Sequence, residues 1–380
     1  MLSALTDRAG TRVCCFLVTF VADISGDTPK RILIVRPSAL GDVCRTVPVL
    51  RRLRIAYPAA RIDWLVQDSF SDAVSAHPDL SNVVPFERSR MAVKKVLRKD
   101  ARSALRALVE QLVANVYDLA IDCQGLSRSG FFTWSTRARR RIGYADAREF
   151  GTIWLTDRVT VPREGHTVDR MLALLPGIDT TFPEAPATPE ELRLHTPPFA
   201  QAQAMELVGD PPPLVVAPTS RWPGKRWPDE RFAKLIGRML DDRVVERVAL
   251  VGGPDELEQV PVCATLAETR DPVINLIGKT GVGELMGVIE ASRMVLANDS
   301  AALHMAVGFD KPLVALFGPT RSDLVGPYGR DHDVLQGAPP NENRHKEEAY
   351  GKSMMEKLTI DDVYTATCER LERTREGASA

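Results

Sequence analysis

The stretch Asn298-Asp299-Ser300-Ala301-Ala302-Leu303-His304 decides the fold of this chain. It joins an apolar run at 293–297 to a segment with apolar residues at helical spacing that ends at Gly308. A strand that passes through small polar residues into a helix is typical of a βα unit, whose helix begins at the carboxyl edge of a sheet. Such a helix start favours an anion, most often a phosphate. On composition alone, Asp299 and Ser300 need do no more than cap the helix.

The composition indicates an ordinary two-domain protein. The chain has 380 residues, 44% of them hydrophobic, which is enough for two domains with their own cores. Its 49 Lys and Arg balance 50 Asp and Glu, so no overall positive field points to a nucleic-acid partner. The six cysteines form neither a CxxC pair nor a tight cluster with histidine. This pattern favours reduced thiols in the cytoplasm over a disulfide framework or a zinc site.

The N-terminal extension, residues 1–29, has more than one interpretation. Its apolar run at 13–22 follows an arginine and resembles the hydrophobic part of an export signal, although it is too short to span a bilayer. An upstream start codon or a tail that leans on a membrane would give the same pattern. Because the rest of the chain has the pattern of an intracellular enzyme, we expect a cytoplasmic protein.

From Lys30 onward the chain alternates between strand and helix patterns. The first half predicts strands at 31–35, 62–66, 83–86, 119–122 and 141–144, with helices at 43–57, 93–116 and 166–175. After a proline-rich segment, the second half predicts strands at 214–217, 248–251, 273–277, 294–297 and 313–317, with helices at 229–240, 256–269, 283–292 and after Asp299. Such alternation indicates mostly parallel sheets covered by helices on both faces.

These patterns predict an α/β protein with two doubly wound domains that face a central cleft. The first domain spans 30–185, a linker 186–212, and the second domain 213–357. A final helix and tail at 358–380 would cross back onto the first domain. In sheets of this kind ligands bind beyond the carboxyl ends of the strands.

The loop after the first strand, residues 36–48, contains a candidate catalytic carboxylate. Gly41 lets the backbone approach a ligand closely, and Asp42 follows at the first turn of the helix. A carboxylate that faces a substrate hydroxyl can act as a general base. A plain helix cap is an equal alternative for Asp42.

Loops of the second domain offer groups for a nucleotide. The loop at 217–228 contains the hydroxyls of Thr219 and Ser220 and three cations including Lys225, enough to hold a diphosphate. The turn at 252–256 places Glu256 where ribose hydroxyls are often held. Each loop also has an ordinary alternative, since most cations are solvated and this turn resembles many helix starts.

Taken together, these stretches resemble glycosyltransferase family 9, the ADP-heptose:lipopolysaccharide heptosyltransferases. The resemblance runs from about residue 31 to 362. It rests on motifs that are weak singly but strong in this order: Gly41-Asp42-(x)3-Thr46-x-Pro48, Lys225-Arg226-Trp227-Pro228, Gly253-Pro254-Asp255-Glu256, Asn298-Asp299-Ser300-(x)3-His304, Lys311-Pro312 and Phe317-Gly318-Pro319-Thr320.

The resemblance implies a GT-B fold, with an acceptor domain followed by a nucleotide-sugar domain. It implies inverting, metal-independent transfer of a heptose from ADP-heptose to a lipopolysaccharide-core-type glycolipid, without a cofactor, at the inner face of the inner membrane. Asp42 would be the base. By position it also implies donor phosphate and sugar contacts from Thr219, Ser220, Lys225, Asp299, Ser300, Ala301 and His304, nucleoside contacts from Glu256 and Thr280, and acceptor contacts from Ser38, Gln124 and Arg128.

Some features depart from the family pattern. Ser300-Ala301 stands where many members carry glycine, and residues 336–356 replace a cysteine-rich segment. Asp331-His332-Asp333 has the carboxylate spacing of a metal-dependent transferase, but its polar surroundings favour a solvated turn. Two other functions stay open: a related enzyme with another nucleotide sugar or a protein acceptor, and a non-catalytic nucleotide-sugar binder.

Overall fold

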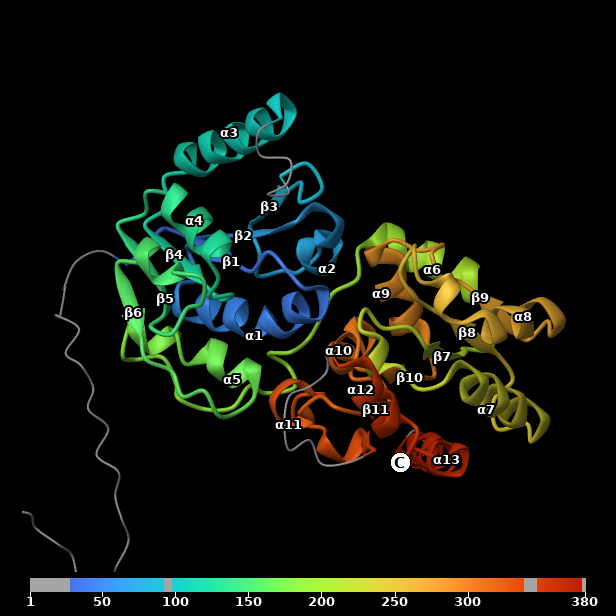
Figure 1. Ribbon diagram of the computed structural model, residues 1–380. Coiled ribbons are helices and arrows are strands. Elements are labelled where there is room, and N and C mark those ends of the chain that lie inside the picture. Colours follow the sequence, from blue (N-terminus) through green and yellow to red (C-terminus); the bar gives the residue numbers. More distant parts are fainter. Residues whose placement is uncertain (1–27, 92–97, 338–346, 378–380) are drawn as a thin grey trace, which may run out of the picture.

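The computed structural model describes residues 28–91, 98–337 and 347–377. The apolar run at 13–22 therefore lies outside the described residues. The chain forms two six-stranded sheets, each entirely parallel (Figure 1). Their strand orders, β3-β2-β1-β4-β5-β6 and β12-β11-β10-β7-β8-β9, follow the same doubly wound pattern. The predicted α/β architecture with two doubly wound domains is confirmed.

The first sheet has a fully buried centre. Its strands are β1 (Arg31–Val35), β2 (Arg61–Gln67), β3 (Asn82–Phe86), β4 (Leu119–Asp122), β5 (Arg140–Tyr144) and β6 (Asp157–Val159). One face is covered by α1 (Leu40–Ala56), α2 (Asp72–Ser75) and α5 (Thr167–Leu172), the other by α3 (Lys99–Ala114) and α4 (Ser127–Ser135). Ile32 and Ile34 pack under α1, whereas Leu33 and Val35 pack under α3 and α4. Burial on both faces explains why β1 is a continuous apolar run.

The second sheet repeats this plan. Its strands are β7 (Leu214–Ala217), β8 (Val248–Leu250), β9 (Val273–Asn275), β10 (Met294–Asn298), β11 (Leu313–Phe317) and β12 (Val334–Gln336). One face is covered by α6 (Pro198–Val208), α9 (Val282–Ala291) and α10 (Ala301–Gly308), the other by α7 (Asp229–Asp241), α8 (Pro261–Thr269) and α13 (Ile360–Gly377). Two short helices, α11 (Ser322–Val325) and α12 (Glu348–Met355), lie between β11 and α13.

The two domains meet through the helices that precede and follow their central strands. α1 packs against α10 and α2 against α9, and one apolar cluster runs through both domains. At Gly41 an added Cβ would lie 2.6 Å from Cδ2 of His304, so only glycine permits this approach of α10 to α1. We call this contact region, formed by α1, α2, α9 and α10, the domain junction.

Two expectations about the chain path are corrected. The segment 186–212 is not a simple linker, because it contains α6, which packs on α9 of the second domain. Its prolines suggested a loop, but Pro198 begins the helix, where the missing N–H is not needed. The final helix α13 packs on α7 and β11 and so belongs to the second domain. In the described part of the chain, the helices are all too short or too polar to cross a membrane.

Candidate active site

Most of the predicted site residues lie at the switch points of the two sheets. In the first domain they follow β1 and β4, which are neighbours in the sheet, and in the second domain most follow β7 and β10, which are also neighbours. Glu256 and Thr280 follow β8 and β9 instead. At a switch point the helices leave to opposite faces of the sheet and separate the two loops, which creates the usual ligand-binding crevice. Two of these helices, α1 and α10, pack on each other at the domain junction.

Asp42 is held by charges on both sides. Its carboxylate forms an ion pair with Arg36 at 2.9 Å, a second one with Arg45, and accepts the backbone N–H of Ala39 at 3.3 Å. Ala39, at the helix start, has no capping side chain, so Asp42 reaches back to cap the helix. Burial alone would raise the pKa of Asp42, but the two guanidinium groups hold this pKa well below its usual range.

Both arginines around Asp42 are buried and were not singled out from the sequence. Arg36 also donates to the backbone carbonyl of Cys123 at the end of β4. Arg45 donates to the backbone carbonyl of Val325 in the second domain at 3.2 Å. The Asp42 carboxylate is therefore tied to the first switch point and, through Arg45, to the opposite domain. The sequence signal was present, since a cation lies six residues before and another three residues after this acid.

Lys225 and Asp299 form the corresponding charged pair of the second domain. Lys225 Nζ lies 2.6 Å from Asp299 Oδ2, and the two side chains are 14% and 10% exposed. The hydroxyl of Ser220 donates to the backbone carbonyl of Asp299 at 3.1 Å. The structure thus joins three predicted donor-site residues, and Asp299 directly positions the lysine ammonium.

Asn298 ties the Lys225 loop to the sheet. Its side-chain oxygen accepts the backbone N–H of Trp227 at 3.1 Å, and its amide donates to the carbonyl of Pro218 at 2.7 Å. Trp227 is itself buried against Phe232. The loop between β7 and α7 is thereby fixed to the end of β10.

The start of α10 presents an unused polar group. Ser300 stands before Ala301, the first residue of the helix, and makes no side-chain cap hydrogen bond. Its hydroxyl is buried and has no hydrogen-bond partner among the described residues. A buried hydroxyl without a partner costs free energy unless a ligand satisfies it. Together with the N–H groups of the helix start, it could bind an oxyanion.

His304 lies between the charges of both domains. It is buried one turn into α10, with its ring against Gly41. Burial lowers its pKa well below the ordinary value, and the positive charge of Arg45 lowers it further. The charge of Asp42 in the first domain raises the pKa of this ring, and the charge of Lys225 in the second domain lowers it. The imidazole is therefore neutral at physiological pH, and it marks where the two predicted active-site loops meet.

The predicted nucleoside residues lie on neighbouring turns of the second domain. The hydroxyl of Thr219 donates to Glu256 at 2.6 Å, and the N–H of Gly253 donates to the same carboxylate oxygen at 2.8 Å. The Gly278 N–H donates to the carbonyl of Gly252 at 3.1 Å, which sets the loop that leads to Thr280 beside this turn. Thr219 thus orients Glu256. The sequence analysis did not predict this role for Thr219.

Of the predicted acceptor residues, Ser38 and Gln124 are hydrogen bonded to each other, and Arg128 acts together with two further arginines. The N–H of Ser38 donates to the Gln124 side chain at 3.3 Å, and Arg128 is exposed at the first turn of α4. Burial, followed by the charges of Arg128 and Arg221, lowers the pKa of Arg88. Arg88 follows β3 and Arg221 follows β7, so cations from both domains converge there. The sequence analysis did not single out Arg88, because only the fold brings it near the others.

The interpretation of Asp331-His332-Asp333 as a solvated turn is wrong for Asp333. Asp333 is 2% exposed and accepts from Arg330 at 2.7 Å and from Arg370 of α13 at 2.6 Å. It therefore anchors α13 to the second domain. Among the described residues, no cluster of three His, Cys, Asp or Glu has the geometry for a metal ion.

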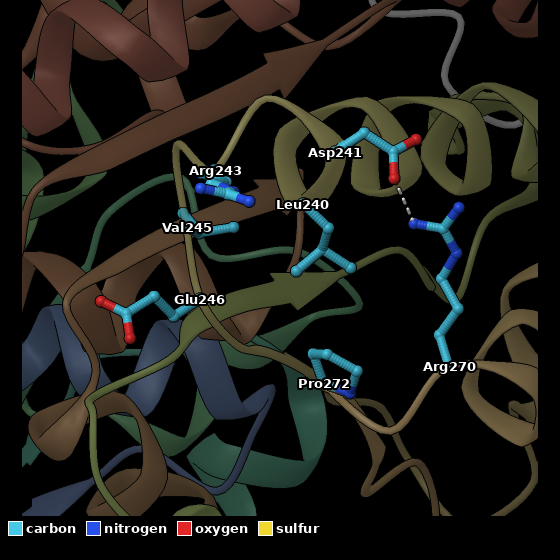
Figure 2. Close-up of a pocket in the computed structure, with 7 residues that line it drawn as sticks. All are labelled: Leu240, Asp241, Arg243, Val245, Glu246, Arg270 and Pro272. Carbon is cyan, nitrogen blue, oxygen red and sulfur yellow. Dashed lines mark hydrogen bonds and ion pairs between the residues drawn. The ribbon is translucent and has the colours of Figure 1, made fainter.

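A separate hollow of about 710 Å³ lies at the end of the second sheet where the strands begin, away from the predicted site (Figure 2). Its lining residues precede β8 and β9, and Arg270 there pairs with Asp241 at 2.9 Å. The amino ends of parallel strands are not where doubly wound domains bind their ligands. This hollow is thus distinct from the candidate active site.

Comparison with known proteins places these features in a family. The profile of glycosyltransferase family 9 (heptosyltransferase) matches residues 105–354. The chain belongs to this family. It is similar to lipopolysaccharide heptosyltransferase 1 of Salmonella typhimurium, with 28% identity over 312 residues that cover 79% of this chain and 92% of that protein.

Solved structures of family 9 members agree with this assignment. The E. coli heptosyltransferase WaaC with ADP superposes with a TM-score of 0.73 at 26% identity, covering 90% of this chain and 99% of that one. The same enzyme with ADP-2-deoxy-2-fluoro heptose gives a TM-score of 0.71 at 25% identity, covering 89% and 99%. This family 9 chain therefore has the predicted GT-B fold and is a glycosyltransferase.

Proposed function

We propose that this chain transfers a heptose from ADP-heptose to a lipopolysaccharide-core-type glycolipid, with inversion and without a metal ion. The observation that carries the proposal is the position of His304, whose buried ring lies against Gly41, the neighbour of Asp42, and which stands in the helix that follows Asp299, the partner of Lys225. An acid of one domain and a cation of the other thus serve one reaction site. The names of the relatives support the donor and the acceptor class.

Asp42 is the proposed general base. An acceptor hydroxyl becomes more acidic as it attacks the anomeric carbon, so even a carboxylate of low pKa can take its proton at that stage. Its two arginines keep Asp42 ionised at every physiological pH. Attack from the first domain on a sugar whose diphosphate is held by the second domain inverts the anomeric configuration.

The second domain supplies the charge that offsets the departing ADP. Lys225 is oriented by Asp299, and the free hydroxyl of Ser300 and the N–H groups that begin α10 add hydrogen bonds to phosphate oxygens. Ser220 and Ala301 complete this phosphate site, and the neutral ring of His304 contacts the sugar. These protein groups replace the charge that a metal ion supplies in other transferases.

The same arrangement provides residues to bind the nucleoside of the donor and to bind the acceptor. Glu256, fixed by Thr219, holds the ribose hydroxyls, and Thr280 lies on the adjoining loop. The three arginines Arg88, Arg128 and Arg221 favour an acceptor with carboxylates or phosphates. An acidic glycolipid suits this site better than a neutral protein surface.

The test combines two variants with separate measurements of transfer and donor binding. We expect Asp42→Asn to lower kcat by about 10²- to 10⁴-fold, the usual contribution of a general base, and to leave the ADP-induced rise in Tm intact. The double variant Lys225→Met, Asp299→Asn avoids an unpaired buried carboxylate and should weaken ADP binding about tenfold or more. Mass spectrometry of the heptosylated acceptor measures transfer.

Matched controls are the exposed residues Asp331 and Lys357. Asp331→Asn and Lys357→Met should leave both measurements unchanged. Normal turnover by Asp42→Asn would exclude Asp42 as the base. A panel of nucleotide sugars in the same Tm assay would identify a different donor, if ADP-heptose failed and another sugar raised Tm.

A further inference from the structure

The outer face of the first domain carries exposed apolar side chains at α4 and the following 3-10 turn, Gly151–Trp154. Trp134 is 48% exposed, Ile153 62% and Phe150 83%. These three residues, called here the aromatic surface, lie close together because α4 packs directly against that turn. α4 covers the sheet face opposite α1, so the aromatic surface lies away from the domain junction (Figure 1).

A rigid base of rings supports the aromatic surface. The Trp134 ring lies 5.5 Å from that of Trp154 and 6.0 Å from that of Phe131, and the rings of Phe131 and Trp154 are 5.7 Å apart. Phe150 has a φ of 60° after Glu149 with a φ of 55°. Two consecutive side-chain-bearing residues in the left-handed region are unfavourable, because the Cβ atom approaches the following carbonyl oxygen. The turn therefore holds Phe150 in solvent despite both backbone strain and apolar exposure.

Unpaired arginines surround the aromatic surface in the sequence and in the fold. Arg128 begins α4, Arg137 and Arg139 follow it, and Arg148 precedes Phe150; all four are exposed. None of them forms an ion pair with another described residue. The acids Asp146 and Asp157 pair with other arginines, which leaves Glu149 as the exposed acid beside them. The region thus keeps a net positive charge.

We propose that the aromatic surface docks this chain on an anionic lipid bilayer. Tryptophan and phenylalanine are stable at the boundary between headgroups and acyl chains, where part of the ring is apolar and part is hydrated. The surrounding guanidinium groups complement lipid phosphates, and each cation near an anionic surface adds to the affinity. A protein surface that binds an anionic bilayer needs an apolar centre surrounded by positive charge, and the aromatic surface has both.

The location of the aromatic surface connects it with the acceptor residues. α4 starts directly after the loop that carries Gln124, and Arg128 belongs to both regions. A glycolipid anchored in the bilayer could therefore present its sugar head to the site while its acyl chains stay in the membrane. This last step rests on the proposed function, whereas the docking itself does not.

The experiment measures co-sedimentation of the full chain with vesicles, without donor or acceptor. Vesicles of phosphatidylethanolamine with 30% phosphatidylglycerol are compared with vesicles of phosphatidylcholine alone. We expect binding to the anionic vesicles only, and a loss of about tenfold or more in the double variant Phe150→Ser, Ile153→Ser. The double variant Arg139→Glu, Arg148→Glu should lose binding similarly.

Matched controls come from the second domain. Phe199 and Met205 on α6 are 56% and 69% exposed, so the variant Phe199→Ser, Met205→Ser removes similar apolar area elsewhere. Lys234→Glu, Lys357→Glu makes the same charge change on other exposed positions. Both controls should bind vesicles like the unaltered chain. All variants carry the same N-terminal extension, so differences among them report on the aromatic surface alone.

Three outcomes would overturn the proposal. They are absence of binding by the unaltered chain, equal binding by the surface and control variants, and a dimer in sedimentation equilibrium that Phe150→Ser, Ile153→Ser dissolves. The last result would assign the surface to a second copy of the chain. The ADP-induced rise in Tm, measured on the same variants, reports separately on the nucleotide site and hence on the proposed function.

Discussion

At the scale of single residues, the two arginines beside Asp42 set the pH dependence expected of the reaction. Because Arg36 and Arg45 hold the pKa of this carboxyl well below its usual range, Asp42 stays ionised throughout the range in which the enzyme works. We therefore expect kcat/KM to show no acid limb from Asp42 above about pH 4, near the ordinary aspartate value.

Removing one of the two arginines beside Asp42 should move the acid limb of kcat/KM to higher pH. In Arg45→Gln the carboxyl loses an ion-pair partner but stays buried, so its pKa should rise into or above its ordinary range and bring an acid limb into the measured profile. The pH profile of kcat/KM measures this. Arg45→Lys keeps the charge and should largely restore the original profile. A profile identical in Arg45→Gln and the unaltered enzyme would show that Asp42 does not control the acid limb.

Single residues also show where prediction from the sequence stopped. Asp42 could be chosen because it follows a strand and a glycine, which are local signals. Arg88 could not, because its proximity to Arg128 and Arg221 depends on contacts between distant loops. Asp333 was misjudged for the same reason: its polar neighbours suggested solvent, but α13 returns to cover it with Arg370.

At the scale of elements, Asn298 should control the loop that carries Lys225. The variant Asn298→Ala removes two buried hydrogen bonds, to Trp227 and Pro218, and leaves backbone groups without partners. We expect a loss of about 1–3 kcal/mol in the free energy of unfolding. Weaker ADP binding should accompany it, because the loop would no longer hold the lysine in place.

Urea unfolding and ADP titration measure these two effects. Gln201→Ala is a suitable control, since its amide bonds Glu290 at the surface of α6. It should leave both quantities nearly unchanged. If Asn298→Ala lowered stability but bound ADP normally, the loop would not depend on this residue for its donor-site geometry.

Elements differed in how well the sequence predicted them. Central strands such as β1, β4, β7 and β11 matched the prediction residue for residue, because strands buried on both faces are continuous apolar runs. The edge strands β6 and β12 were missed. β6, Asp157–Val159, is short and carries charged residues, so its sequence resembles a loop and only pairing with β5 makes it a strand.

At the scale of the whole molecule, the way the two domains meet also depends on contacts that no local pattern encodes. His166 of the first domain accepts the N–H of Val168 at Nδ1 and donates from Nε2 to the carbonyl of Gly326 in the second domain at 3.0 Å. Tyr328 accepts the N–H of Ala187 and donates to Asp169. The motifs predicted two switch points, but such contacts determine which faces of the domains meet.

Buried histidines make the stability of the whole molecule depend on pH. Burial lowers the pKa of His166 to about 4, with the charge of Arg45 adding to the effect, and burial lowers that of His77 to about 4 as well, with His195 adding. Since the ordinary value is 6.5, the unfolded chain binds more protons than the folded one between pH 6.5 and 4. Stability is therefore complete above pH 6.5 and falls as the pH decreases toward 4.

The expected slope is up to about 1.4 kcal/mol per pH unit for each of the two histidines. Urea unfolding at a series of pH values measures it. His166→Gln should reduce the slope, because the amide keeps a donor toward Gly326 without titrating. His332→Gln, at an exposed position, should leave the slope unchanged. An unchanged slope in His166→Gln would mean that protonation of this ring does not lower the free energy of unfolding, and the acid sensitivity would then have to arise from other groups.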